Sequence, residues 1–138
     1  MPRFRRNLGV GYENLAAALA ERGLHQEGLE AVAKAQALYE ALAREDPGNV
    51  QATVDLASAC NVRAKLLGGT GRGGEALATY AKGLSLLEGP MRASAEFLQP
   101  HLLTADALTG MGELHVTRSD FAAARGVFEK AVAKREMI

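Results

Sequence analysis

The sequence aligns with itself at a spacing of 48 residues, and this repeat constrains the fold more than any other feature. Small residues recur at several positions of the unit, and large apolar residues recur at another. The matched sets are Ala16, Ala64 and Gly112; Gly28, Ala76 and Ala124; Val32, Tyr80 and Phe128; and Ala35, Gly83 and Ala131. Small side chains let helices approach closely, and large ones fill the space between them. The repeat therefore predicts three copies of one unit that bury their apolar faces by stacking.

Helical periodicity fills each unit. Leu8, Tyr12, Leu15 and Leu19 follow a four, three, four spacing, which places them on one face of a helix. The predicted helices carry residues 8–19, 29–42, 50–67, 76–87, 101–117 and 121–135. We find no alternating β-branched run and no Asn-Gly hairpin turn in the sequence. We therefore predict an all-α fold, an α-solenoid of three antiparallel helix hairpins.

Glycine, proline and short polar residues predict where the helices end. The residues that align at the turn within each unit are Gly23, Gly71 and Ser119. Ser119 also suits the N-cap of the sixth helix. The glycine-rich stretch 68–74 is predicted to end the third helix and form a flexible turn, and Gly89-Pro90 is predicted to end the fourth helix. Residues 91–100 stay open between a helical segment and a loop.

The repeat defines a single domain over residues 1–138, with units at approximately 5–46, 50–90 and 98–138. A chain of this length can bury a core without disulfide bonds or a metal ion. Aromatic residues make up only 5% of the chain. We therefore expect a core built mainly of Ala, Leu and Val.

Composition excludes several classes of function. Sixteen basic residues balance sixteen acidic ones without a basic stripe, so we expect no nucleic-acid binding. The apolar runs are too short to span a membrane. Glu13, Asn14 and Glu21 interrupt the apolar stretch after the basic start, which argues against a signal peptide. Cys60 is the single cysteine, so no intrachain disulfide can form, and we expect a cytoplasmic protein.

At its repeated positions the chain resembles the tetratricopeptide repeat family. That family's pattern is a large residue, then Leu-Gly and an aromatic residue on the first helix, followed by Ala-x-x-x-aromatic and Ala on the second. The matching positions are Tyr12, Leu15-Ala16, Leu19, Gly28, Val32 and Ala35; Cys60, Arg63-Ala64, Leu67, Ala76, Tyr80 and Gly83; and Leu108, Met111-Gly112, His115, Ala124, Phe128 and Ala131. The resemblance implies a right-handed superhelix that binds proteins.

The length of the unit departs from the usual pattern of that family. Its common unit has 34 residues and a proline that closes the second helix. Glu40, Glu88 and Glu136 stand at that position here, so the chain is similar to the longer-unit bacterial variants. Segment 44–49 and the residues 55–57 look like repeats found in tandem in large bacterial signalling proteins. Whether the chain is a separate module or part of a longer array stays open.

The resemblance also implies a ligand groove along the first helix of each hairpin. The residues carried over to its wall are Val10, Glu13, Ala17, Ala20 and Glu21; Ser58, Asn61, Lys65 and Gly68; and Asp106, Thr109, Glu113, Val116 and Thr117. Acidic residues outnumber basic ones on this wall. Glu13 and Ala17 stand where the family's clamp for a terminal carboxylate has Lys and Asn. A neutral or basic ligand segment therefore suits the groove better than a carboxylate.

We identify no residues for catalysis, metal binding or a cofactor. The glycine-rich stretch 68–74 lacks both the preceding strand and the Gly-Lys-Ser/Thr ending of a phosphate-binding loop. His25, His101 and His115 lack acidic partners at metal-site spacing, so we interpret them as structural. Cys60 occupies a core packing position, which favours a buried small hydrophobe over a nucleophile.

These observations predict a non-enzymatic interaction scaffold that binds a protein or peptide through its concave face. Two alternatives stay open. The chain can be a regulatory or spacer segment of a larger bacterial signalling protein, or a homo-oligomer that associates through end helices, at residues 8–19 and 127–132. The sequence does not identify the partner.

Overall fold

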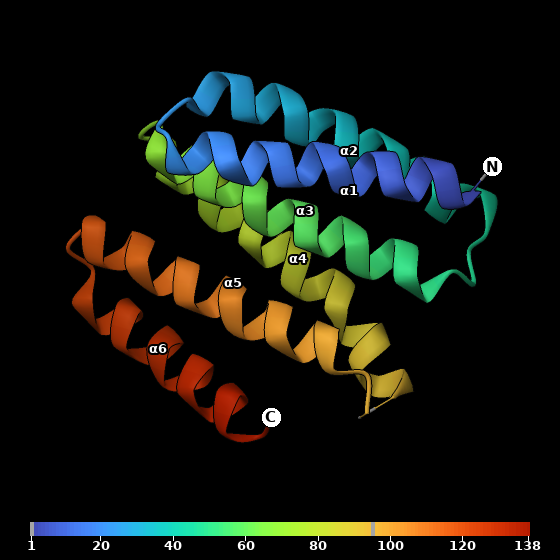
Figure 1. Cartoon of the computed structure of the whole chain (residues 1–138). Coiled ribbons are helices and arrows are strands. Elements are labelled where there is room, and N and C mark those ends of the chain that lie inside the picture. Colours follow the sequence, from blue (N-terminus) through green and yellow to red (C-terminus); the bar gives the residue numbers. More distant parts are fainter. Residues whose placement is uncertain (1, 95) are drawn as a thin grey trace.

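The computed structural model describes residues 2–94 and 96–138, and this part of the chain is all-helical, as predicted. The helices follow one another in space as they do in sequence, from α1 and α2 at one end to α5 and α6 at the other (Figure 1). Their bounds are α1 Pro2–Glu21, α2 His25–Glu45, α3 Val50–Gly69, α4 Gly73–Ala93, α5 Leu98–Thr117 and α6 Phe121–Glu136. No helix within these residues is long and apolar enough to cross a membrane.

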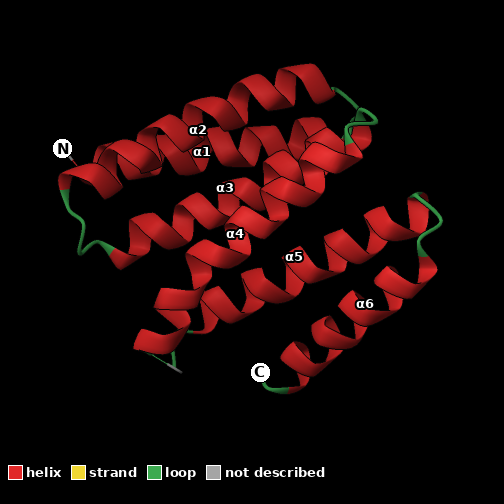
Figure 2. Cartoon of the chain, turned by 180° about the vertical axis from the view of Figure 1, so that it is seen from behind, coloured by secondary structure: helices red, strands yellow, loops and turns green. Residues whose placement is uncertain are grey.

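Helices that are adjacent in the chain contact each other, and the odd-numbered helices also touch, α1 with α3 and α3 with α5. The view from behind shows the same order of helices, with loops only at their ends (Figure 2). We refer to α1–α2, α3–α4 and α5–α6 as the helix pairs, because a turn of three residues joins the members of each. The groove described below lies among the odd-numbered helices.

The turns within the helix pairs share one backbone geometry. Their central residues, Gly23, Gly71 and Ser119, have positive φ angles of 76°, 79° and 59°. The residue after each one donates its N–H to the carbonyl five residues back, at 2.8–3.0 Å. These are Schellman-type helix ends, in which a left-handed residue closes the last turn. The residues that align at a spacing of 48 therefore adopt equivalent conformations.

Two predictions about helix ends were wrong at these turns. The glycine-rich stretch 68–74 is not a turn over its whole length, since only residues 70–72 lie between α3 and α4. Gly68 stays helical because α5 packs on it, and a Cβ there would lie 2.9 Å from Leu114 Cδ2. Ser119 is not the N-cap of α6. Asp120 is, and its Oδ1 accepts a hydrogen bond from the Ala123 N–H at 3.2 Å.

The fourth helix does not end at Gly89-Pro90 but continues to Ala93 with Pro90 inside it. Met91 packs on the apolar cluster around Leu87, and Thr104 Oγ1 lies 3.4 Å from Met91 Sδ. This packing holds the last turn of α4 against α5. Of the open segment 91–100, residues 91–93 and 98–100 are helical, and residue 95 lies outside the described residues.

The core is rich in alanine, as its composition predicted, and the matched small residues are buried. Aromatic side chains of the even-numbered helices lie against glycines of the odd-numbered ones. Tyr39 Cε1 lies 2.7 Å from the position that a Cβ on Gly9 would take, and Phe128 Cε1 lies 2.5 Å from the equivalent position on Gly112. Because glycine has no Cβ, each ring occupies the space that an alanine Cβ would fill, and the two helices of a pair can approach closely.

The apolar face predicted for the first helix was partly wrong. Tyr12 and Leu19 pack against the core, as expected. Leu8 and Leu15 instead point outward and are 40% and 50% exposed. The reason is that α2 packs on the side of α1 that carries Gly9 and Ala16, both fully or largely buried.

Candidate functional site

A groove of about 400 Å³ opens among α1, α3 and α5, with one residue of α4 at its floor. We call it the central groove. Its lining residues are Ala17, Ala20 and Glu21 of α1; Ser58, Asn61, Val62 and Lys65 of α3; Tyr80 of α4; and Leu103, Asp106, Thr109, Gly110 and Glu113 of α5. Its volume lies within the range of about 300–1,000 Å³ that is typical of ligand sites.

Most of the predicted groove residues come together in the central groove. Ala17, Lys65 and Glu113 are spaced by 48 residues and line it from three successive odd-numbered helices. Asn61 and Thr109 form part of a second such set. Among the predicted wall residues, Val10, Glu13, Gly68, Val116 and Thr117 lie outside the lining of the groove.

The missing side chain of Gly110 makes room for Tyr80 at the floor of the groove. Gly110 lies directly against the ring of Tyr80, at a distance that leaves no room for a Cβ. The Tyr80 side chain can therefore extend from α4 between α3 and α5 to the groove. Burial, followed by the negative charges of Glu113 and Asp106, raises the pKa of the Tyr80 phenol to about 12. The phenol stays protonated at neutral pH and supplies a hydroxyl rather than a charge.

The charges around the groove are mainly negative. Glu21, Asp106 and Glu113 lie on its rim, against one cation, Lys65. Asp106 accepts a hydrogen bond from Arg135 at 3.0 Å, which neutralises part of its charge. Within the described residues, no ion pair holds Glu21 or Glu113. The groove therefore has an acidic rim over an uncharged floor.

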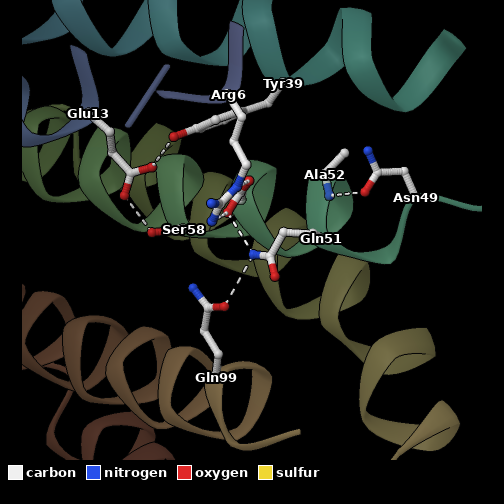
Figure 3. Close-up of polar contacts among 9 residues, drawn as sticks. Arg6, Glu13, Tyr39, Asn49, Gln51, Ala52, Ser58 and Gln99 are labelled. Carbon is white, nitrogen blue, oxygen red and sulfur yellow. Dashed lines mark hydrogen bonds and ion pairs between the residues drawn. The ribbon is translucent and has the colours of Figure 1, made fainter. Parts of the chain in front are cut away.

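Glu13 was predicted to line the groove, but the structure places it beside the groove in a polar cluster (Figure 3). Tyr39 Oη donates to one of its carboxylate oxygens at 3.1 Å, and Ser58 Oγ donates to the other at 2.5 Å. Burial raises the pKa of the Glu13 carboxyl, and the two hydrogen bonds oppose that shift. Glu13 thus joins α1 to α2 and α3, and it holds the hydroxyl of Ser58 at the edge of the groove.

A second polar cluster joins α1, α3 and α5, and sequence reasoning missed it. Arg6 Nε donates to Asp55 Oδ2 at 2.8 Å, and the Asp55 side chain is only 5% exposed. Gln51 donates to the other oxygen of Asp55 at 2.9 Å and to Gln99 at 3.2 Å. This chain of contacts runs from α1 through α3 to α5 (Figure 3). The one signal available was that Gln51 and Gln99 are matched by the repeat.

The other candidate residues lie away from the groove. His25 packs against Gly69, and its Nδ1 is buried without a hydrogen-bond partner among the described residues. His101 Nδ1 lies 3.2 Å from Lys134 Nζ. Cys60 is fully buried, as predicted, and burial raises the pKa of its thiol. No cluster of His, Cys, Asp and Glu in the described chain has the grouping that a metal ion requires.

Comparisons with protein-family models, with curated proteins and with solved structures found no match.

Proposed function

We propose that this chain is a non-enzymatic interaction module that holds an extended, positively charged peptide segment in the central groove. The observation that carries the proposal is the acidic rim of a groove built from repeat-matched positions of α1, α3 and α5. A binding site assembled from equivalent positions of successive repeats is suited to a ligand that is itself extended.

We further propose that the helix pairs form an α-solenoid of the tetratricopeptide-like type. The recurrence of one turn geometry at residues 23, 71 and 119 supports this arrangement. So do the contacts among odd-numbered helices, since a superhelix of such pairs has its first helices on the concave side. We place the module in the cytoplasm, because Cys60 is a free, buried thiol.

The groove would recognise a Lys or Arg side chain by both parts of that side chain. Ala17, Ala20 and Leu103 offer apolar contact to its aliphatic stem. Glu21 and Glu113 offer charge to its cationic end. The polar contacts that join α1, α2, α3 and α5 hold the wall in place before the ligand arrives, so that the ligand bears most of the ordering cost.

A random-peptide display library, screened against the intact chain, tests the ligand class. We expect the enriched peptides to contain Lys or Arg, and we expect their affinity to fall as the salt concentration rises. An enriched peptide, labelled with a fluorophore, then reports binding by fluorescence polarisation. The absence of enrichment, or enrichment of acidic peptides, would contradict the proposal.

A charge reversal locates the binding site. Glu113→Lys replaces attraction by repulsion at the rim, and we expect the affinity for the selected peptide to fall about fivefold, since an exposed charge pair contributes roughly 0.2–1 kcal/mol. Glu30→Lys is the matched control, because Glu30 is an exposed residue of α2 that does not line the groove. An equal loss in both variants would show that net charge, rather than the groove, governs binding.

A further inference from the structure

The outward face of α1 carries an apolar stripe that nothing else in the described chain covers. The stripe consists of Phe4, Leu8, Gly11, Leu15 and Ala18, spaced by four, three, four and three residues. Phe4 is 66% exposed, Leu15 is 50% exposed and Leu8 is 40% exposed. Its members repeat at the seven-residue interval that is typical of the seam between two packed helices.

The repeat shows what this face does in the other odd-numbered helices. The stripe matches Ala52, Leu56, Ala59, Arg63 and Leu66 of α3, and Pro100, Thr104, Ala107, Met111 and Leu114 of α5. On α3, Leu56, Ala59 and Leu66 are buried in the cluster formed with α1 and α2. On α5, Ala107 is buried in the cluster formed with α3 and α4. The same face is thus a helix-packing interface on both α3 and α5.

We propose that the α1 stripe binds the α1 stripe of a second copy of this chain, with the two helices antiparallel around a twofold axis near Gly11. Such pairing places Phe4 opposite Ala18 and Leu8 opposite Leu15, so that a large residue meets a small one and two of similar size meet each other. Gly11 meets its own equivalent at the axis. A Cβ on Gly11 would contact nothing in its own chain, which leaves that space for the partner.

One edge of the stripe does not oppose this pairing. Asn7 and Asn14 flank it on one side and are exposed and uncharged, so the two copies bring no like charges together there. The antiparallel arrangement also places the positive end of each helix dipole beside the negative end of the other.

A head-to-tail contact between α1 of one copy and the outward face of α6 of another fits less well. Leu29 packs between helix pairs, but its match in α6 is Arg125, whose side chain is 83% exposed. Leu87 is fully buried, and its match in α6 is Arg135. Stacking α6 on an apolar stripe would take Arg125 and Arg135, which pair with Glu129 and Asp106, out of water, and burying charged pairs is costly. We therefore expect a closed dimer instead of an open filament.

Light scattering coupled to size exclusion measures the association over a hundredfold concentration range. We expect the mass of the wild type to approach twice the 14.6 kDa of one chain. Leu15→Glu should remain a single chain throughout. Val132→Glu is the matched control, since Val132 is 55% exposed on α6 and outside the stripe. A wild type that stays at 14.6 kDa, a mass that grows beyond the dimer, or a Val132→Glu variant that becomes monomeric overturns the proposal.

A cysteine at the axis tests the geometry itself. Gly11→Cys should form a disulfide-linked dimer within minutes of mild oxidation, whereas Ala133→Cys, on the exposed side of α6, should not. Cys60 is fully buried and does not compete. Equal crosslinking of the two variants overturns the antiparallel arrangement. Circular dichroism confirms that each variant is folded, and peptide binding by Leu15→Glu is expected to be unchanged, because the stripe does not line the central groove.

Discussion

Substitution of Ser119 can measure how much the left-handed backbone conformation of this turn costs in folding free energy. Ser119 has a φ angle of 59°, in the region that residues with a Cβ rarely adopt, whereas the matched residues of the other turns are glycines. Its side chain is exposed and makes no hydrogen bond among the described residues. Replacing it by glycine therefore changes the backbone preference and little else.

The expected gain follows from two opposing effects. The left-handed conformation disfavours a residue with a Cβ by about 1–2 kcal/mol. Glycine loses more entropy on folding, which offsets roughly 0.5–1 kcal/mol of that gain. We expect Ser119→Gly to raise the free energy of unfolding by about 0.5–1 kcal/mol, and to raise the Tm by about 2–3 °C for a domain of this size.

Urea and thermal unfolding, followed by circular dichroism at 222 nm, provide the measurement. Gly71→Ser is the reverse substitution at a matched position, where a Cβ would meet nothing within 4 Å, so it should lower the free energy of unfolding by a similar amount. Ser85→Gly is the control within a right-handed helix, on an exposed site of α4, and it should be destabilising. If Ser119→Gly and Ser85→Gly were equally destabilising, the backbone argument would be refuted.

Two further predictions concern packing and pH. Gly112→Ala should lower the free energy of unfolding by about 1–3 kcal/mol, because its Cβ would clash with Phe128. Gly126→Ala meets open space on α6 and should raise the free energy of unfolding by roughly 0.5–1 kcal/mol. Urea unfolding of both variants measures the two changes, and equal changes would contradict the packing argument. The folded pKa of Glu13 lies above its ordinary value of 4.5, so its ionisation should reduce stability as the pH rises from 4.5 through the raised pKa. Glu13→Gln has no carboxyl to ionise, so its free energy of unfolding relative to the wild type should increase over that pH interval. Urea unfolding at pH 4–7 measures this difference. A difference that stays constant with pH would show that burial does not shift the pKa of the Glu13 carboxyl.

The helices and their turns were largely predictable, since local spacing and backbone preference determine them. Apolar periodicity located the body of each helix, and the 48-residue match located the turn residues Gly23, Gly71 and Ser119 before their φ angles were known. Most, but not all, of the groove positions implied by the family resemblance line one groove, as with Ala17, Lys65 and Glu113. These matched residues come together because α1 contacts α3 and α3 contacts α5.

Local rules failed where long-range packing was stronger than backbone preference. Gly68 remains helical although glycine has a low helix propensity, because Leu114 packs directly on it. Pro90 lies inside α4 because the turn beyond it is held by contacts of Met91 with the core. Leu8 and Leu15 fit an apolar face by spacing, yet they point away from α2.

The sequence by itself determined that this chain is helical, that its unit recurs every 48 residues and that its core is made of small residues, because these properties follow from side-chain size and spacing along one helix. Only the tertiary structure decided which carboxylates line the groove and which are buried. Glu13 and Glu113 look alike in sequence, but one is bound by Tyr39 and Ser58 while the other stands at an open rim. The physical reason is that hydrogen bonding and burial depend on residues many turns away, whose approach is set by how the helices pack.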